Sequence, residues 1–155
     1  GRKRDEAALD DFEFRDQAGH LIRRLHQIAT SMFLERCRDV GATPVQYAAL
    51  NAIARHASFE QRHIARMIAV DRTTINLVTK KLCERGWVER LAEGKRIRLR
   101  VTPSGLDILQ RLEAATASHG EELLAPLDPA GRTAFVKALK VLVEGNNEFS
   151  RVPTS

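Results

Sequence analysis

The stretch that decides the fold is residues 61–101, QRHIARMIAVDRTTINLVTKKLCERGWVERLAEGKRIRLRV. Its first part predicts two short helices, Gln61–Ile68 and Arg72–Arg85, separated by three residues. Asp71 is placed to cap the second helix, whose buried stripe is expected to be Ile75, Val78 and Leu82. Two short helices joined by a tight turn are typical of a helix-turn-helix.

The remainder of this stretch predicts a β-hairpin. Gly86 ends the second helix, Trp87–Leu91 is extended, and a turn at Ala92–Lys95 leads into a second strand, RIRLRV. Strict alternation in that strand puts apolar residues on one face and basic residues on the other. These are, in turn, Ile97, Leu99 and Val101, and Arg96, Arg98 and Arg100. We therefore expect a two-stranded wing with a basic outer face.

Two helices are predicted before this winged region. Apolar residues at three- and four-residue spacing from Phe14 to Phe33 indicate a long amphipathic helix, which ends near Gly41. Thr43-Pro44 then supplies an N-cap and a first-turn proline for a helix that continues to His56. That second helix is apolar nearly all round, so we expect it in the core.

Helices are also predicted after the wing. Thr102-Pro103 opens a long helix whose apolar positions extend to Leu123, and Asp128-Pro129 opens the last one. The end helices are longer than the middle of the chain needs for its own core, so their apolar stripes are expected to pack against a second subunit. The predicted fold class is mainly α with a small β-wing: a winged helix-turn-helix flanked by N- and C-terminal dimerisation helices.

Size and composition fit a single domain that binds a polyanion. The chain has 155 residues, with 25 Lys and Arg against 20 Asp and Glu, which gives a net charge of +5. Neither a membrane-spanning apolar stretch nor a secretory signal is visible, so we expect a cytoplasmic protein with no membrane partner. The absence of a phosphate loop, nucleophile elbow or paired acid-base motif argues against an enzyme, and we expect no cofactor.

Four pieces of sequence, in order and at the right separation, resemble the MarR family of bacterial transcriptional regulators. They are TPVQYAAL at 43–50, DRTT at 71–74, LCERGWVER at 82–90 and LRVTPSG at 99–105. The resemblance covers about Phe14 to Val143 and implies one MarR-like domain. Within it, residues of about 12–42 and 103–150 are expected to form dimerisation helices, and those of about 43–102 the DNA-binding region.

This resemblance implies that the second helix of the helix-turn-helix enters the major groove of duplex DNA. Short polar and basic groups near its start can reach bases and phosphates, while a wing Arg can reach phosphates or the minor groove. The family often has Thr-Arg where this chain has Asn76-Leu77, and the wing looks shorter than usual. The expected DNA-binding residues are Arg72, Thr73, Thr74, Asn76, Lys80, Lys95, Arg96 and Arg98. We expect a palindromic operator bound by a homodimer.

The family also implies a small-molecule effector. Residues 19–27 and 43–47 look like a subgroup that often controls breakdown of aromatic acids or their coenzyme A thioesters. His20, Arg24 and Tyr47 could supply the cation and hydrogen-bond donors that an aromatic carboxylate needs. Alternatively, His20 and Arg24 are exposed or pair with acids such as Asp16 and Glu35. The predicted function is a repressor that such a ligand releases from DNA.

Three other interpretations are weighed against this one. Cys37 lies between two arginines, which can lower a thiol pKa, and either it or Cys83 could sense oxidants, although most intracellular cysteines are inert. The five histidines show no metal-ligand spacing, so no metal site is expected. A winged helix used only for protein contacts is the main alternative from another class, and the basic wing and helix argue against it.

Overall fold

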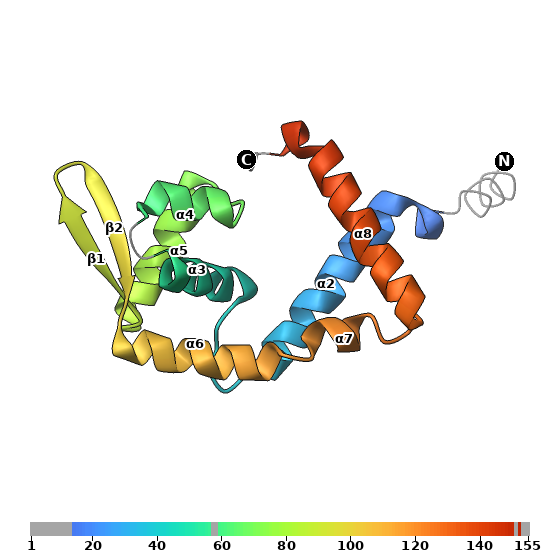
Figure 1. The fold of residues 1–155 in the computed structure, drawn as a ribbon, viewed down its shortest axis with the longest axis horizontal. Coiled ribbons are helices and arrows are strands. Elements are labelled where there is room, and N and C mark those ends of the chain that lie inside the picture. Colours follow the sequence, from blue (N-terminus) through green and yellow to red (C-terminus); the bar gives the residue numbers. More distant parts are fainter. Residues whose placement is uncertain (1–13, 57–58, 151, 153–155) are drawn as a thin grey trace, which may run out of the picture.

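The computed structural model describes residues 14–56, 59–150 and 152, so residues 12 and 13 of the predicted first arm lie outside it. The chain is mainly helical with one antiparallel hairpin, which confirms the predicted fold class (Figure 1). The elements are η1 Phe14–Asp16, α2 Ala18–Arg36, α3 Pro44–Arg55, α4 Gln61–Met67, α5 Arg72–Glu84, β1 Val88–Glu93, β2 Arg96–Val101, α6 Pro103–Thr116, α7 His119–Leu123, α8 Pro129–Gly145 and η2 Asn147–Phe149.

Helices α3, α5, α6 and α8 begin where the sequence predicts because local capping residues determine those positions. Thr43 forms a full capping box, in which its hydroxyl accepts from the Gln46 amide at 3.2 Å and its own amide donates to the Gln46 side chain at 3.1 Å. Asp71 caps α5 through the Thr74 amide at 2.7 Å. Thr102 and Asp128 cap α6 and α8 in the same way.

One hydrophobic core lies where α3, α4, α5, β2 and α6 meet. Its fully buried large side chains are Leu50, Ile53, Ile64, Ile75, Leu82, Leu99 and Leu112. Burial of each such side chain is worth about 1.5–3 kcal/mol relative to exposure. Phe33 and Cys37 at the end of α2 join the same core. The core therefore extends beyond residues 43–102 on both sides.

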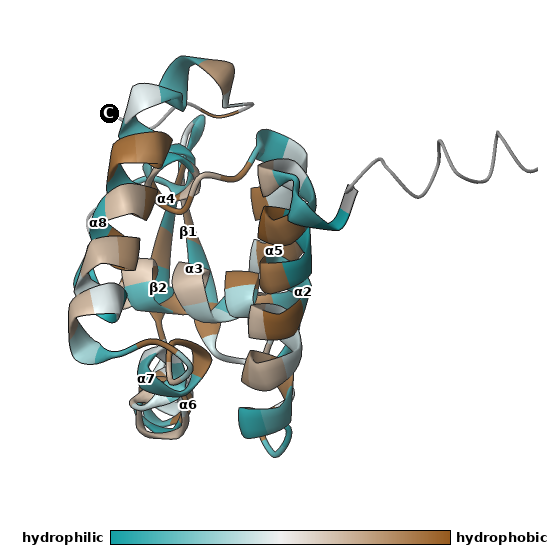
Figure 2. Cartoon of the chain, turned by 90° about the vertical axis from the view of Figure 1, so that its right-hand side faces the viewer, coloured by the Kyte–Doolittle hydropathy of each residue, from teal (hydrophilic) through white to brown (hydrophobic). Residues whose placement is uncertain are grey.

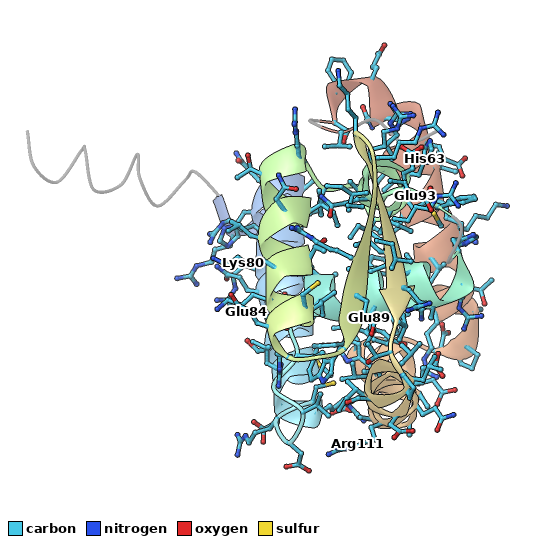
Figure 3. The ribbon with its side chains drawn as sticks, turned by 90° about the vertical axis from the view of Figure 1, so that its left-hand side faces the viewer. His63, Lys80, Glu84, Glu89, Glu93 and Arg111 are labelled. Atoms are coloured by element: carbon cyan, nitrogen blue, oxygen red, sulfur yellow. The ribbon has the colours of Figure 1, made fainter. Side chains whose placement is uncertain are left out.

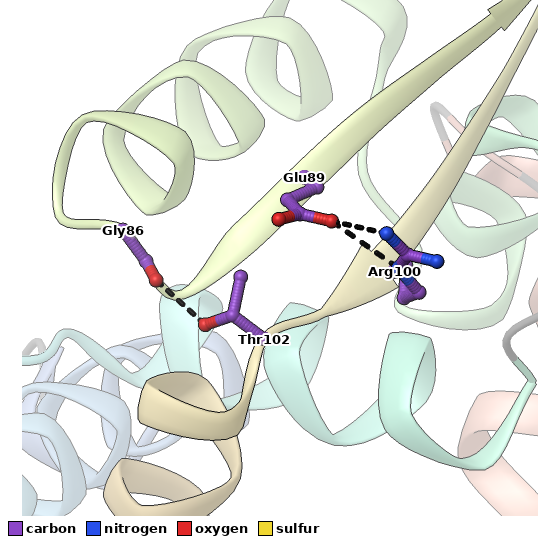
Figure 4. A network of polar contacts seen from close by, with 4 residues as sticks. All are labelled: Gly86, Glu89, Arg100 and Thr102. Atoms are coloured by element: carbon purple, nitrogen blue, oxygen red, sulfur yellow. Dashed lines mark hydrogen bonds and ion pairs between the residues drawn. The ribbon is translucent and has the colours of Figure 1, made fainter.

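The joint between the wing and α6 is unusually close. A Cβ atom added to Gly105 would lie 2.1 Å from the Trp87 carbonyl oxygen, so only glycine fits there. The Thr102 hydroxyl donates to the Gly86 carbonyl at 2.6 Å and accepts from the Gly105 amide at 3.0 Å (Figure 4). These contacts fix the hairpin relative to the helix that leaves it.

Three predicted boundaries are wrong. The first helix, predicted from Phe14 to near Gly41, is the short η1 followed by α2, which ends at Arg36. The predicted four-residue wing turn is a two-residue turn at Gly94-Lys95, because β1 continues to Glu93, which pairs with Arg96. The single long helix expected after Thr102 is broken at residues 117–118 into α6 and α7. Arg36 of α2 donates to Ser118 Oγ at 3.2 Å at this break and forms an ion pair with Glu122 beyond it.

The end helices α2 and α8 leave apolar side chains exposed. Figure 2 shows the two helices on opposite sides of the view, with hydrophobic residues along both. No residue of α8 is buried, and its exposed apolar residues include Val136, Leu139, Val141, Leu142 and Val143. On α2 the exposed apolar residues include Leu21, Ile22 and Ile28. Among the helices that the structure describes, none has the length and hydropathy needed to cross a membrane.

Candidate DNA-binding surface and effector pocket

Helix α5 has one apolar face in the core and one polar face in solvent. Ile75, Thr79 and Leu82 point inward and are buried. Arg72, Asn76 and Lys80, spaced four residues apart, share the exposed face, where Thr73 is also exposed and Thr74 is half-buried. Figure 3 shows Lys80 on the outer side of α5. The polar face expected from the sequence is therefore present on an intact helix.

The alternation predicted for the second strand is present in β2, but its three arginines share the outer face of the wing with acids of β1, so that face is less basic than expected. Arg100 Nη2 donates to Glu89 Oε2 at 2.5 Å across the hairpin (Figure 4), and Arg98 Nε lies 3.3 Å from Glu93 Oε2. Arg96 lies 3.5 Å from Glu60, which precedes α4. Glu89 lies in register with Arg100 and Glu93 with Arg96, whereas Leu91 lies opposite Arg98, so opposite charges face each other at two of these three positions.

A hollow of about 670 Å³ lies between α4, α5 and the wing, and we call it the wing hollow. Its cationic lining residues are Arg62, Arg66, Arg72 and Lys95. No ion pair is recorded for Arg72 or Lys95 within the described residues, whereas Arg62 pairs with Glu60 at 3.0 Å. Helix α5 and the wing tip therefore present cations to the same space.

A second hollow of about 670 Å³, here the α2 hollow, lies along the N-terminal part of α2. It is lined by Arg15, His20, Leu21, Arg24, Leu25 and Ile28. His20, half-buried, and Arg24, exposed as the alternative interpretation expects, both line this hollow beside apolar side chains. Tyr47 is not part of this lining and instead packs on Phe33, with ring centroids 5.8 Å apart. Glu35, weighed as an alternative partner for Arg24, forms an ion pair with Arg38.

The two cysteines lie in surroundings that oppose thiolate formation. Cys37 is 1% exposed, and its burial raises the pKa of the thiol above its ordinary value despite the opposing charge of Arg36. Burial likewise raises the pKa of Cys83, with Arg90 acting in the opposite sense. A thiol with a raised pKa is a poor nucleophile near neutral pH. Within the described residues, no group of three His, Cys, Asp or Glu is arranged to hold a metal ion.

Comparisons with known proteins agree with this geometry. A model described as the MarR family matches residues 40–97, which run from the turn before α3 into β2. A putative transcriptional regulatory protein for the hcr operon of Thauera aromatica is 30% identical over 138 residues, which are 84% of this chain and 83% of that protein. The chain belongs to the MarR family.

Two further relatives match most of this chain. The HTH-type transcriptional repressor NicR of Pseudomonas putida is 24% identical over 145 residues, which are 90% of this chain and 92% of NicR. The crystal structure of the PcaV regulator of Streptomyces coelicolor with its natural ligand is 28% identical. It covers 85% of this chain and 95% of PcaV, with a TM-score of 0.76. The chain is thus a MarR-family transcriptional regulator and not an enzyme.

Several charged residues at the wing and at the α2 hollow were not predicted from the sequence. Glu89 and Glu93 could have been noticed, because they alternate along the first strand opposite the predicted arginines. Glu60 gives no such signal, since its contact with Arg96 joins residues 36 positions apart. Arg15 was missed at the α2 hollow; it lies in η1, before α2 begins at Ala18, and not in the long helix predicted from Phe14.

Proposed function

We propose that this chain is a repressor that binds a palindromic operator as a homodimer and leaves it when an aromatic carboxylate or its coenzyme A thioester binds. The observation that carries the DNA-binding part is the exposed row of Arg72, Asn76 and Lys80 on α5, beside Lys95 at the wing tip. A helix of this kind fits the major groove, and a hairpin beside it can reach the adjacent backbone.

The predicted DNA-binding residues differ in the roles we assign them. Arg72 and Lys95 have no recorded acidic partner in the described chain, so they can neutralise phosphates at no cost in lost ion pairs. To bind a phosphate, Arg96 must give up its ion pair with Glu60, and Arg98 must give up its ion pair with Glu93. Both pairs are partly solvated, and exposed pairs contribute only about 0–1 kcal/mol, so this exchange is feasible. Thr73, Thr74 and Asn76 contribute hydrogen-bonding groups at the start of α5.

We assign dimerisation to the apolar residues that α2 and α8 leave exposed. Apolar side chains gathered on a helix with no buried residue mark an interaction surface, and a second copy carries the same surface. A two-fold dimer would place the two α5 helices about 34 Å apart, one turn of DNA. The arms of this dimer are residues of about 12–42 and 103–150, and the remaining part of the domain is the DNA-binding region.

We place the effector in the α2 hollow. Arg24 can bind a carboxylate there, and Leu21 and Ile28 offer apolar surface to an aromatic ring. His20 adds a polar group on the same side, whereas Tyr47 does not line this hollow, and we leave it out of the proposed site. PcaV, which shares the fold at 28% identity, was solved with its natural ligand, which supports a small-molecule effector here. NicR is named a repressor, which supports repression.

The DNA-binding proposal is tested by titrating duplex DNA from the promoter region beside the gene at several salt concentrations. In a plot of the logarithm of affinity against the logarithm of salt concentration, the slope should be about −0.9 for each neutralised phosphate. Several neutralised phosphates should therefore give a slope of several negative units. Arg72→Ala should weaken binding and lower this slope by about 1. Lys137→Ala, which removes an exposed cation from α8, is the matched control and should change neither. A flat salt response would favour a module that binds protein instead.

A further inference from the structure

The arginine that follows α5 connects three parts of the molecule. Arg85, the C-cap residue of α5, donates through Nη2 to the Val40 carbonyl at 2.6 Å and through Nη1 to the Gly41 carbonyl at 3.0 Å. Its guanidinium carbon lies 3.8 Å from the ring centroid of Trp87, the buried residue that leads into β1. One side chain thus joins the end of α5 to the linker between α2 and α3 and to the start of the wing.

The linker offers Arg85 a well-packed pair of acceptors. Its two carbonyls belong to the turn after α2, in which the Gly41 amide donates to the Cys37 carbonyl at 2.8 Å and Gly41 adopts a φ of +68°. Val40 and Ala42 are both buried in the core, so the backbone that carries these carbonyls is held in place. Hydrogen bonds from an ionised donor are stronger than neutral ones, and a planar guanidinium can reach two acceptors at once.

The two ends of this contact have different roles in the proposed dimer. Helix α2 is one of the arms assigned to the two-fold interface, whereas α5 is the helix assigned to the major groove. Because a two-fold axis repeats any displacement of α5 relative to its arm in the second copy, the distance between the two α5 helices changes by up to twice that displacement. Successive base pairs are about 3.4 Å apart, so a shift of under about 2 Å in each copy corresponds to one base pair.

We propose that Arg85 is a positioning residue that holds α5 at a fixed place relative to the α2 arm, so that the dimer selects one spacing between half-sites. The anchor consists of the two hydrogen bonds to the linker and the packing of the guanidinium on Trp87. In this role Arg85 contacts neither a base nor a phosphate. The inference rests on the proposed function, in which a homodimer binds a palindromic operator.

The test changes the spacing and leaves the half-sites unchanged. The full chain first selects its operator from a randomised duplex library, and duplexes are then made with one or two base pairs added or removed at the centre of that site. The wild type should bind the selected spacing at least about tenfold more tightly than a spacing one base pair longer or shorter. Arg85→Met removes both hydrogen bonds but keeps an unbranched side chain over Trp87, so this preference should fall to about threefold or less.

The salt dependence of binding separates this role from a direct contact with DNA. Loss of a phosphate contact would weaken binding equally at every spacing and reduce the salt slope by about 1, whereas loss of the anchor should leave the slope unchanged. Arg111→Met removes an exposed cation from α6 and is the matched control, which should keep both the slope and the spacing preference. If Arg85→Met does not melt cooperatively, Arg85→Lys carries the test. A lysine keeps the charge but lacks the planar fork that reaches both carbonyls, so the spacing preference should again fall.

The possible results distinguish this inference from the proposed function. If the folded Arg85 variants keep the wild-type spacing preference, or lose affinity equally at every spacing together with a lower salt slope, the inference is overturned and the proposed repressor survives. The same holds if the wild type binds every spacing equally well. If the wild type selects no palindromic duplex, the proposed function fails and this inference falls with it.

Discussion

Helices α3 and α8 are equally apolar on average, yet they bury very different amounts of surface. In α3 the side chains of Ala49, Leu50, Ala52 and Ile53 are buried, whereas α8 buries none. Five other elements, α2, α4, α5, β2 and α6, contact α3, while α8 leaves residues such as Val141 and Val143 more than half exposed. Apolar content alone therefore cannot tell whether a helix is covered by its own chain. The winged middle has a buried core within one chain, whereas the apolar residues of α8 stay exposed, and these are the residues that we propose pack against a second subunit.

The largest effect expected from this difference follows removal of α8. Deleting the chain from Asp128 onward should abolish dimerisation and lower operator affinity by at least about a hundredfold, because the second half-site no longer binds intramolecularly. The winged middle should retain its circular dichroism and cooperative melting, since α8 contributes no buried residue to its core. Sedimentation and DNA titration measure the two effects.

Substitutions within α8 provide the control for this deletion. Lys137→Ser with Lys140→Ser changes only exposed cations and should leave the dimer intact, whereas Leu139→Glu should weaken it. A deleted protein that stays dimeric and binds DNA normally would place the interface elsewhere.

The second-largest expected effect is a loss of stability in the winged middle. Gly105→Ala should lower the free energy of unfolding by about 2–4 kcal/mol, because the new Cβ would meet the Trp87 carbonyl at 2.1 Å and the joint has no room to relax. Thermal or urea denaturation of the dimer measures this loss. Gly120→Ala is the matched control, since a Cβ there meets nothing within 4 Å. Equal stability of the two variants would mean that the wing joint is looser than these contacts imply.

Local signals made the order of elements predictable from the sequence. Helix starts at Pro44, Arg72, Pro103 and Pro129 follow capping residues whose hydrogen bonds involve neighbours three positions away, so the information is within a few residues. The break between α6 and α7 was not predictable in this way. It coincides with contacts of Arg36, which is 82 residues from Ser118 in sequence.

The candidate site was predictable only in part for the same reason. The residues on the exposed face of α5 follow from helical periodicity, and the position of His20 and Arg24 at one hollow follows from their spacing of one turn. Tyr47 was grouped with them because it lies near in the family-like sequence, but its ring packs on Phe33 in another direction. The contact of Gln61 with Asn76 depends on the angle between two helices, which periodicity does not encode.

The smallest expected effect is on ligand response, after a substitution in α2 that should leave the winged middle unchanged. Arg24→Ala should leave operator binding without ligand nearly unchanged, because Arg24 lies at the α2 hollow and outside the residues assigned to DNA. It should raise the concentration of aromatic carboxylate needed for release by about ten- to a hundredfold, since a charged hydrogen bond is worth about 1.5–3 kcal/mol. Release titrations with a panel of aromatic acids and thioesters measure this shift. Arg38→Ala, at an exposed ion pair near the end of α2, is the control and should respond like the wild type. If Arg24→Ala is released at the wild-type ligand concentration, Arg24 is not the carboxylate anchor. If no member of the panel releases the wild type, the proposed effector class is excluded, while DNA binding is unaffected.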